Sequence, residues 1–141
     1  MRIKRVALLV VLALAGAVPV FAHHSFAAEF DENKPVVLKG VVSKIEWENP
    51  HVYFYIDVKD DKSGSTVNWG VESTSVVELI HRGWSHDSLK LGDHVTVEGF
   101  LAKDGSHLVG ARLVTLPDGR KVFTGSPGDG GPGDPAKAQD Q

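Results

Sequence analysis

The alternation of apolar and polar side chains between positions 51 and 58 constrains the fold of this chain more than any other feature. Four apolar side chains share one face of an extended segment there: Val52, Phe54, Ile56 and Val58. Four polar or aromatic side chains share the other face: His51, Tyr53, Tyr55 and Asp57. Because successive side chains of a strand point to opposite faces of a sheet, this pattern predicts a half-buried β-strand.

Further strands and one helix are expected around this segment. Runs rich in β-branched residues, bounded by turn residues, predict strands at 36–47, 66–72, 94–101, 107–116 and, more briefly, 120–124. A helix is predicted over 74–82, where three apolar residues recur at helical spacing: Val76, Val77 and Ile80. A serine or threonine at 73–75 can cap this helix, and Gly83 can end it.

The order of these elements predicts the fold class. Three strands, a helix and two more strands are the order of a five-stranded OB-like barrel. Gly40 and Gly99 stand where a closed sheet must coil. We therefore expect an all-β domain with one short helix over residues 36–124, preceded by an N-terminal segment at 23–35. An open β-sandwich or another small barrel fits the same pattern.

The first 22 residues have the pattern of a cleavable signal peptide. Basic residues precede an apolar run at 6–18, which is too short to span a membrane comfortably, and Ala22 ends a region of small and medium residues. Cleavage there makes His23 the first residue of a periplasmic protein. An uncleaved membrane anchor and cleavage after Ala27 are the alternatives.

The composition excludes several classes of function. Removing residues 1–22 takes away three of the 15 Lys and Arg and none of the 18 Asp and Glu, so the mature formal charge is −6 (12 against 18). That balance argues against a nucleic-acid binder and against docking on anionic lipid. The chain has no cysteine, hence no disulfide and no thiolate ligand. Residues 125–141 are rich in Gly and Pro and are expected to be a disordered tail.

Processing creates the most unusual candidate site. A first residue His23 offers its free α-amine and its ring Nδ1 to one metal ion, and a second imidazole completes a three-nitrogen set that suits Cu(II). This arrangement resembles the histidine brace of copper monooxygenases and of some periplasmic copper carriers. His51 is the candidate third ligand, because its strand would hold it rigidly; His24, His94 and His107 are alternatives. The competing interpretation is that two adjacent histidines occur there by chance.

A second candidate site surrounds the corner at 46–51, which reads Glu-Trp-Glu-Asn-Pro-His. The residue before a proline is pushed to an extended conformation, so the corner should be fixed. An aromatic ligand-binding surface would then consist of Trp47, Asn49, His51, Tyr53 and Tyr55. The alternative is a packed corner, with Trp47 in the core and Asn49 in an Asx-turn. No catalytic motif is present, so no catalytic residue is assigned.

Residues 22–126 resemble a family of small secreted bacterial proteins of unknown function. Its members begin His-His-Ser-Phe after the signal peptide and carry Glu-Trp-x-Asn-Pro-His, as this chain does at 23–26 and 46–51. Further matching motifs are Lys-Pro-Val at 34–36, Arg-Gly-Trp at 82–84, Asp-Ser-Leu-Lys at 87–90 with Gly-Asp at 92–93, and Leu-Pro-Asp-Gly-Arg at 116–120. The resemblance implies a periplasmic location and a small barrel, and it supplies no activity.

Three functions follow as hypotheses. The first is a periplasmic protein that binds a small ligand or a metal, with copper held by His23. The second is an accessory module that docks a partner protein on the barrel face around His51, Tyr53 and Tyr55. The third is a copper-dependent redox enzyme.

Overall fold

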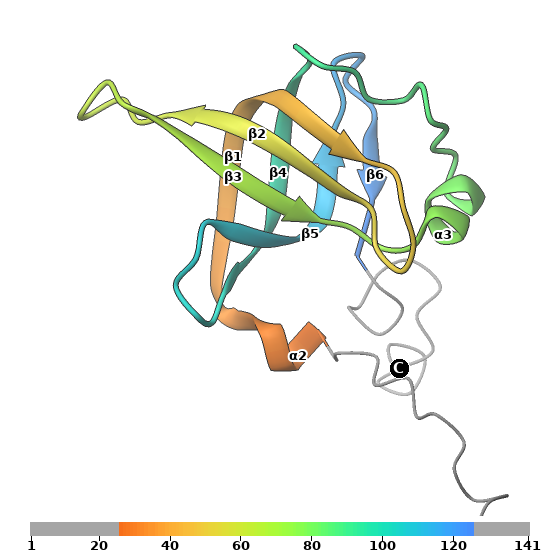
Figure 1. Ribbon diagram of the computed structural model, residues 1–141, viewed down its shortest axis with the longest axis horizontal. Coiled ribbons are helices and arrows are strands. Elements are labelled where there is room, and N and C mark those ends of the chain that lie inside the picture. Colours follow the sequence, from red (N-terminus) through yellow and green to blue (C-terminus); the bar gives the residue numbers. More distant parts are fainter. Residues whose placement is uncertain (1–25, 126–141) are drawn as a thin grey trace, which may run out of the picture.

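The computed structural model describes residues 26–125 as six strands and two short helices (Figure 1). In chain order these are α2 (Phe26–Glu29), β1 (Phe30–Glu46), β2 (Tyr53–Lys59), β3 (Thr66–Glu72), α3 (Val76–His81), β4 (His94–Ala102), β5 (Leu108–Thr115) and β6 (Lys121–Phe123). In this part of the chain no helix has the length and apolar character needed to cross a membrane.

The first five strands close into a ring. β1 pairs antiparallel with β2 and with β4. β2 also pairs antiparallel with β3, and β4 pairs antiparallel with β5. A parallel pairing of β3 with β5 then joins the two ends of the sheet, and β6 extends β5 beyond it. The strand order around the ring is therefore β1-β2-β3-β5-β4, with α3 between β3 and β4 in the chain. The prediction of an all-β, OB-like domain is confirmed.

Some element bounds differ from the predicted ones. The structure has a second helix, α2, and β1 begins at Phe30 rather than at 36, because Phe30 and Pro35 already pair with β4. The polar composition of 31–34 gave no sign of this part of the strand, because these residues form an irregular stretch between the paired Phe30 and Pro35 and their side chains lie mostly at the surface. α3 is shorter at both ends than the predicted 74–82, and β2 begins two residues later, at Tyr53.

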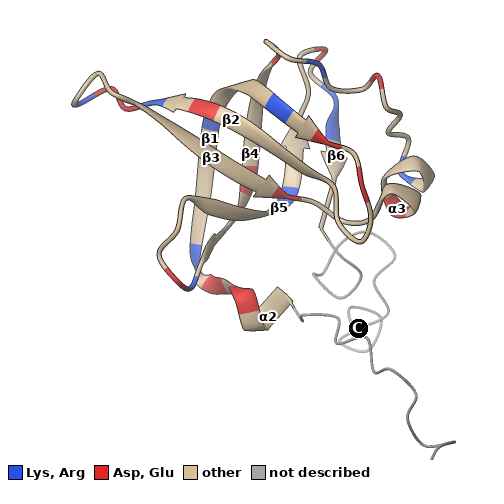
Figure 2. Cartoon of the chain, in the orientation of Figure 1, with Lys and Arg blue, Asp and Glu red and all other residues tan. Residues whose placement is uncertain are grey.

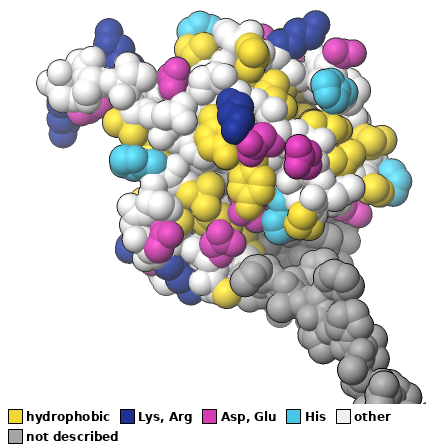
Figure 3. Space-filling model, viewed as in Figure 1, with side chains coloured by type: hydrophobic (Ala, Val, Ile, Leu, Met, Phe, Trp, Pro, Cys, Tyr) yellow, Lys and Arg dark blue, Asp and Glu magenta, His cyan; other side chains and the backbone are white. Residues whose placement is uncertain are grey.

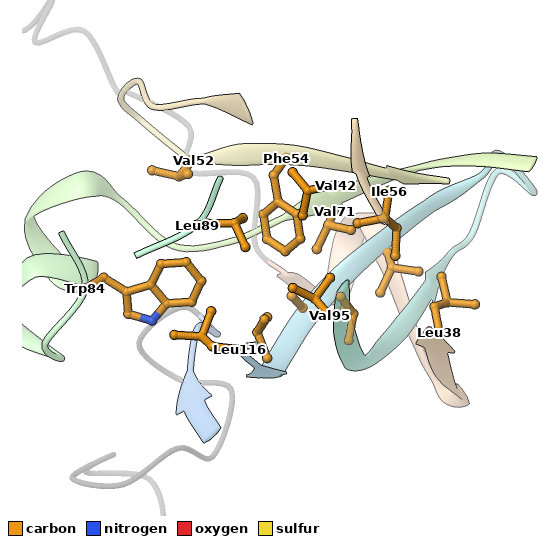
Figure 4. Close-up of a cluster of buried hydrophobic side chains, with 14 of the residues drawn as sticks. Leu38, Val42, Val52, Phe54, Ile56, Val71, Trp84, Leu89, Val95 and Leu116 are labelled. Atoms are coloured by element: carbon orange, nitrogen blue, oxygen red, sulfur yellow. The ribbon is translucent and has the colours of Figure 1, made fainter. Parts of the chain in front are cut away.

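The ring encloses one hydrophobic core. The predicted inward face of this segment is confirmed: Val52, Phe54 and Ile56 are at most 2% exposed, and Val58 is partly buried against the core. Trp84 lies at one end of the core beside Leu89 and Leu116, and Leu38 lies at the other end (Figure 4). Acidic and basic residues are interspersed along the strands (Figure 2).

Two glycines allow the strands to approach closely. A Cβ at Gly99 would lie 2.2 Å from the carbonyl oxygen of Gly110, across the β4–β5 pair. A Cβ at Gly40 would lie 2.8 Å from the carbonyl oxygen of Asp57. Both are shorter than a carbon–oxygen contact can be, so these positions exclude any side chain. Close approach of a neighbouring strand therefore explains glycine at both positions, and the β4–β5 register is irregular between Glu98 and Gly99.

Candidate functional site

The candidate site is built on Glu72, the last residue of β3. Val71 points into the core, so the next side chain along the strand points to the outer face of the ring. The β2–β3 register places Tyr53 directly opposite Glu72. Although it lies on the outer face, Glu72 is only 8% exposed, because other parts of the chain cover it.

The two oxygens of Glu72 have different partners. The Nδ1 atom of His51 lies 2.7 Å from Oε1. The hydroxyl group of Tyr53 donates a hydrogen bond of 2.6 Å to Oε2. We call these three residues, His51, Tyr53 and Glu72, the carboxylate cluster. The His51 side chain remains partly accessible, at 26% exposed.

Tyr53 is held in its neutral form. Burial raises the pKa of its hydroxyl group well above the ordinary value, and the hydrogen bond to the Glu72 carboxylate raises it further. A neutral phenol can donate to a carboxylate, whereas a phenolate would repel it. Tyr53 therefore acts as a fixed donor that holds Glu72 in place at neutral pH.

A small cavity of about 10 Å³ lies against the carboxylate cluster. Its polar walls are Glu72, Ser73 and Thr124, and its other walls are Phe26, Phe30, Gly110 and Ala111. Ser73 is 3% exposed and Thr124 is fully buried. Within residues 26–125, neither side-chain hydroxyl group has a hydrogen-bond partner. A cavity of this size has room for about one water molecule.

The N-terminal segment 26–30 covers this cavity from outside the ring, where α2 lies below β5 in Figure 1. The ring of Phe26 packs at a tilt against that of Phe30, with 5.2 Å between centroids, and meets Phe100 edge-on at 5.6 Å. Lys103 adds two hydrogen bonds, from its backbone N–H to the Glu29 carbonyl at 2.9 Å and from Nζ to the Ala27 carbonyl at 2.5 Å. Aromatic packing and backbone contacts thus fix the segment beside Glu72.

Two of the predicted surface residues lie in other contacts. The Trp47 ring packs partly against the core and meets His86 edge-on, with 5.9 Å between ring centroids. Asn49, which precedes Pro50 through a cis peptide bond, accepts a hydrogen bond of 3.3 Å from the Val76 N–H at the start of α3. Both residues therefore have structural contacts at the corner, although Trp47 is only partly buried and Asn49 caps α3 instead of forming the Asx-turn of the packed-corner alternative.

Tyr55 belongs to a separate surface group. Its hydroxyl group donates to Oε2 of Glu46 at 3.1 Å, and the Nζ atom of Lys44 lies 5.1 Å from its ring centroid. The structure therefore brings together two of the five predicted surface residues, His51 and Tyr53, and joins them through Glu72.

The candidate metal ligands are distributed differently. His23 and His24 lie outside the described residues. His94 is exposed at the start of β4, and His107 packs against Trp69 with 4.8 Å between ring centroids. Within residues 26–125, no three His, Cys, Asp or Glu side chains are placed to hold a metal ion. The histidine side chains visible in Figure 3 lie at separate places on that face.

Sequence reasoning missed the residues that complete the site: Glu72, Ser73, Thr124, Phe26 and Phe30. One signal for Glu72 was available, because apolar Val67, Trp69 and Val71 share one face of its strand and leave Glu72 on the other. The register with Tyr53 and the docking of Phe26 depend on tertiary contacts, and no local pattern reveals them.

The fold and the site define a small closed β-sheet protein with an N-terminal segment docked beside a histidine–carboxylate pair. The chain belongs to DUF6152, a family of unknown function, whose profile matches residues 10–111. The match includes His51, Tyr53 and Glu72, and it ends at one wall of the cavity, Ala111. No curated protein matches the sequence.

Proposed function

We propose that this protein is a periplasmic metal-binding protein that holds Cu(II) between a mature N-terminal His23 and the imidazole of His51. The observation that carries the proposal is the 2.7 Å contact between Nδ1 of His51 and Oε1 of Glu72. Histidines that bind metals almost always donate their other ring N–H to a carboxylate, a carbonyl or water, which fixes the tautomer and orients the ring. When Nδ1 carries the proton, Nε2 of His51 has a free lone pair for a metal.

The position of Phe26 supports the involvement of His23. Phe26 lines the same cavity as Glu72, which contacts His51. Three residues of extended chain span at most about 10 Å, so a terminus at His23 stays within that distance of Phe26. The aromatic packing of Phe26 therefore limits how far a terminus at His23 can lie from the carboxylate cluster.

The proposal fixes the direction of the pH dependence. The metal binds the neutral imidazole and the neutral amine, so it competes with protons for both groups. Copper affinity should therefore weaken as the pH falls, with release of protons on binding.

Calorimetric titration with Cu(II) tests the proposal. Protein that begins at His23 is compared with protein that retains Ala22, which moves the free amine away from the ring without changing any side chain. We expect weaker binding for the longer protein. Glu72→Gln should weaken binding by about 10- to 100-fold, as is typical of the loss of a carboxylate that orients a ligand.

His81→Ala is the matched control, since it removes an exposed histidine at the end of α3 and should leave the affinity unchanged. Equal affinities for the proteins that begin at Ala22 and His23 would overturn the proposal. In that case the interaction-module hypothesis would replace it, with the outer face of β2 around Tyr53 and Tyr55 as the docking surface.

A further inference from the structure

A groove of about 680 Å³ lies at the end of the ring where β4 begins. Residues of β1, β2, β4 and β5 line it, and β4 begins beside the turn that follows β5 at the top of Figure 1. Its volume falls within the range of about 300–1,000 Å³ that is typical of small-molecule sites. None of its lining residues belongs to the carboxylate cluster, so this groove is a separate candidate site.

Two lysines line the groove where the pairing of β1 with β2 ends. The last paired residues are Val41 of β1 and Asp57 of β2, which lie opposite each other. Two residues further along each strand, on the same face, are Lys39 and Lys59, and both line the groove. A continued register would place these two lysines directly opposite each other, where like charges repel. This part of the groove therefore carries two neighbouring positive charges.

The two positive charges have no partner in the part of the chain that the structure describes. No ion pair or hydrogen bond joins the ammonium group of Lys39 or of Lys59 to another residue within 26–125. The two carboxylates of the groove, in contrast, have partners. Asp57 accepts a hydrogen bond of 2.7 Å from a side-chain amide of β3, and Asp93 accepts one of 2.8 Å from a backbone N–H of its own turn. The unsatisfied groups of the groove are thus its cations, which favours an anionic ligand.

Hydroxyl groups and apolar side chains complete the groove. The strand registers align Lys39 with Thr96, and Thr96 with Thr115, in one row across β1, β4 and β5. Both threonines line the groove, and their hydroxyl groups can donate hydrogen bonds to an anion. Val41 and Pro117 add apolar surface to the same groove. Such a surface suits the carbon skeleton of an organic anion better than a bare inorganic ion.

We propose that this groove binds a small organic anion with two or more carboxylate groups, held between the ammonium groups of Lys39 and Lys59. One carboxylate pairs with each lysine, which removes the repulsion between the two cations. The threonine hydroxyl groups donate further hydrogen bonds, and the carbon skeleton lies on the apolar surface. This site is independent of the proposed function, because it needs neither cleavage after Ala22 nor copper.

Calorimetric titration of the metal-free protein with citrate tests the inference. We expect saturable binding at one site, and much weaker binding of acetate, which has a single carboxylate. Lys39→Gln and Lys59→Gln should each weaken citrate binding by up to about fivefold, as expected for exposed ion pairs, and the double variant should weaken it further. Lys62→Gln is the matched control, since it removes the same charge from the exposed turn after β2 and should leave the affinity unchanged.

A second measurement locates the ligand. In NMR spectra the methyl groups of Thr96 and Thr115 should shift on addition of citrate. Pyrophosphate, which is a multivalent anion without a carbon skeleton, should bind more weakly than citrate. Undiminished citrate affinity in the double lysine variant, or tighter binding of pyrophosphate, would refute the inference. His51→Ala removes a proposed copper ligand and should leave citrate binding intact, so failure of the proposed function can be told apart from failure of this site.

Discussion

Glu72 connects the residues of the candidate site. Its carboxylate accepts a hydrogen bond from Tyr53, contacts His51 and lines the cavity, while it is only 8% exposed. A carboxylate is costly to bury unless hydrogen bonds and nearby positive charge compensate it. Glu72 therefore orders the side chains around it, and their geometry depends on its charge.

The first prediction concerns the tyrosines. The protein has two, and the pKa of each is raised above 10.0, mainly by burial and then by a carboxylate partner. An alkaline titration of phenolate absorbance should therefore show both ionising above the ordinary value, with Tyr53 last. Tyr53→Phe should remove the later step, whereas Tyr55→Phe should leave it.

The same shift predicts how stability changes with pH. A raised pKa in the folded state favours the neutral phenol, so this stabilisation is complete below pH 10.0 and is lost as the pH rises above it. Denaturant unfolding should show that the free energy of unfolding falls less steeply above pH 10.0 in Tyr53→Phe. An identical decline in both proteins would contradict the hydrogen-bonded, buried position of Tyr53.

At the scale of elements, α3 shows how the corner at 46–51 is used. This six-residue helix begins with two side-chain caps: Ser75 Oγ accepts from the Glu78 N–H at 3.3 Å, and Asn49 accepts from the Val76 N–H. A helix this short has few hydrogen bonds of its own, so its caps contribute much of its stability. The Asn-Pro corner therefore supports the helix through Asn49.

The second prediction tests these caps. Ser75→Ala should lower the free energy of unfolding by about 0.5–2 kcal/mol, as expected for loss of an N-cap. Asn49→Ala should also destabilise, because the Val76 N–H loses its acceptor. Val77→Ala is the control, since that side chain is 54% exposed and should have little effect. Urea unfolding measures all three, and a larger loss for Val77→Ala than for Ser75→Ala would disprove the capping argument.

At the scale of the whole molecule, the site depends on a segment packed on the outside of a closed ring. Gly110 of β5 is the surface on which this segment rests, because a Cβ there would lie 2.8 Å from the rings of both Phe26 and Phe30. The same residue takes part in the ring, pairing with Phe100 in β4 and with Glu72 in β3. Gly110 therefore takes part both in closure of the ring and in docking of the N-terminal segment.

The third prediction distinguishes docking of the N-terminal segment from closure of the ring. Gly110→Ala should displace the two aromatic rings and loosen the segment, while the ring of strands keeps its pairing. Hydrogen exchange at the Lys103 N–H, which donates to the Glu29 carbonyl, should become faster. Gly99→Ala is the contrasting variant: its Cβ would meet a backbone carbonyl at 2.2 Å, so it should destabilise the whole domain. Similar global destabilisation by both changes would contradict a separable segment.

The sequence by itself determined the properties that arise from local pattern. Alternation in β2 identified which side chains face the core, and the order of strands and helix indicated an OB-like ring. These predictions succeeded because strand periodicity, turn residues and helix caps act over a few residues. The same reasoning placed His51 and Tyr53 on the outer face, where the structure has them.

Only the tertiary structure decided which of these residues form a site. Glu72 contacts His51 and Tyr53 because β3 pairs with β2 in one register. Phe26 and Thr124 line the same cavity because the N-terminal segment packs over β5. Such contacts join residues far apart in the chain, and their free energy comes from packing and from the hydrogen bonds that compensate a buried carboxylate. No pattern within a single segment predicts these contacts. The roles of Glu72, Ser73 and Thr124 could therefore be identified only from the tertiary structure.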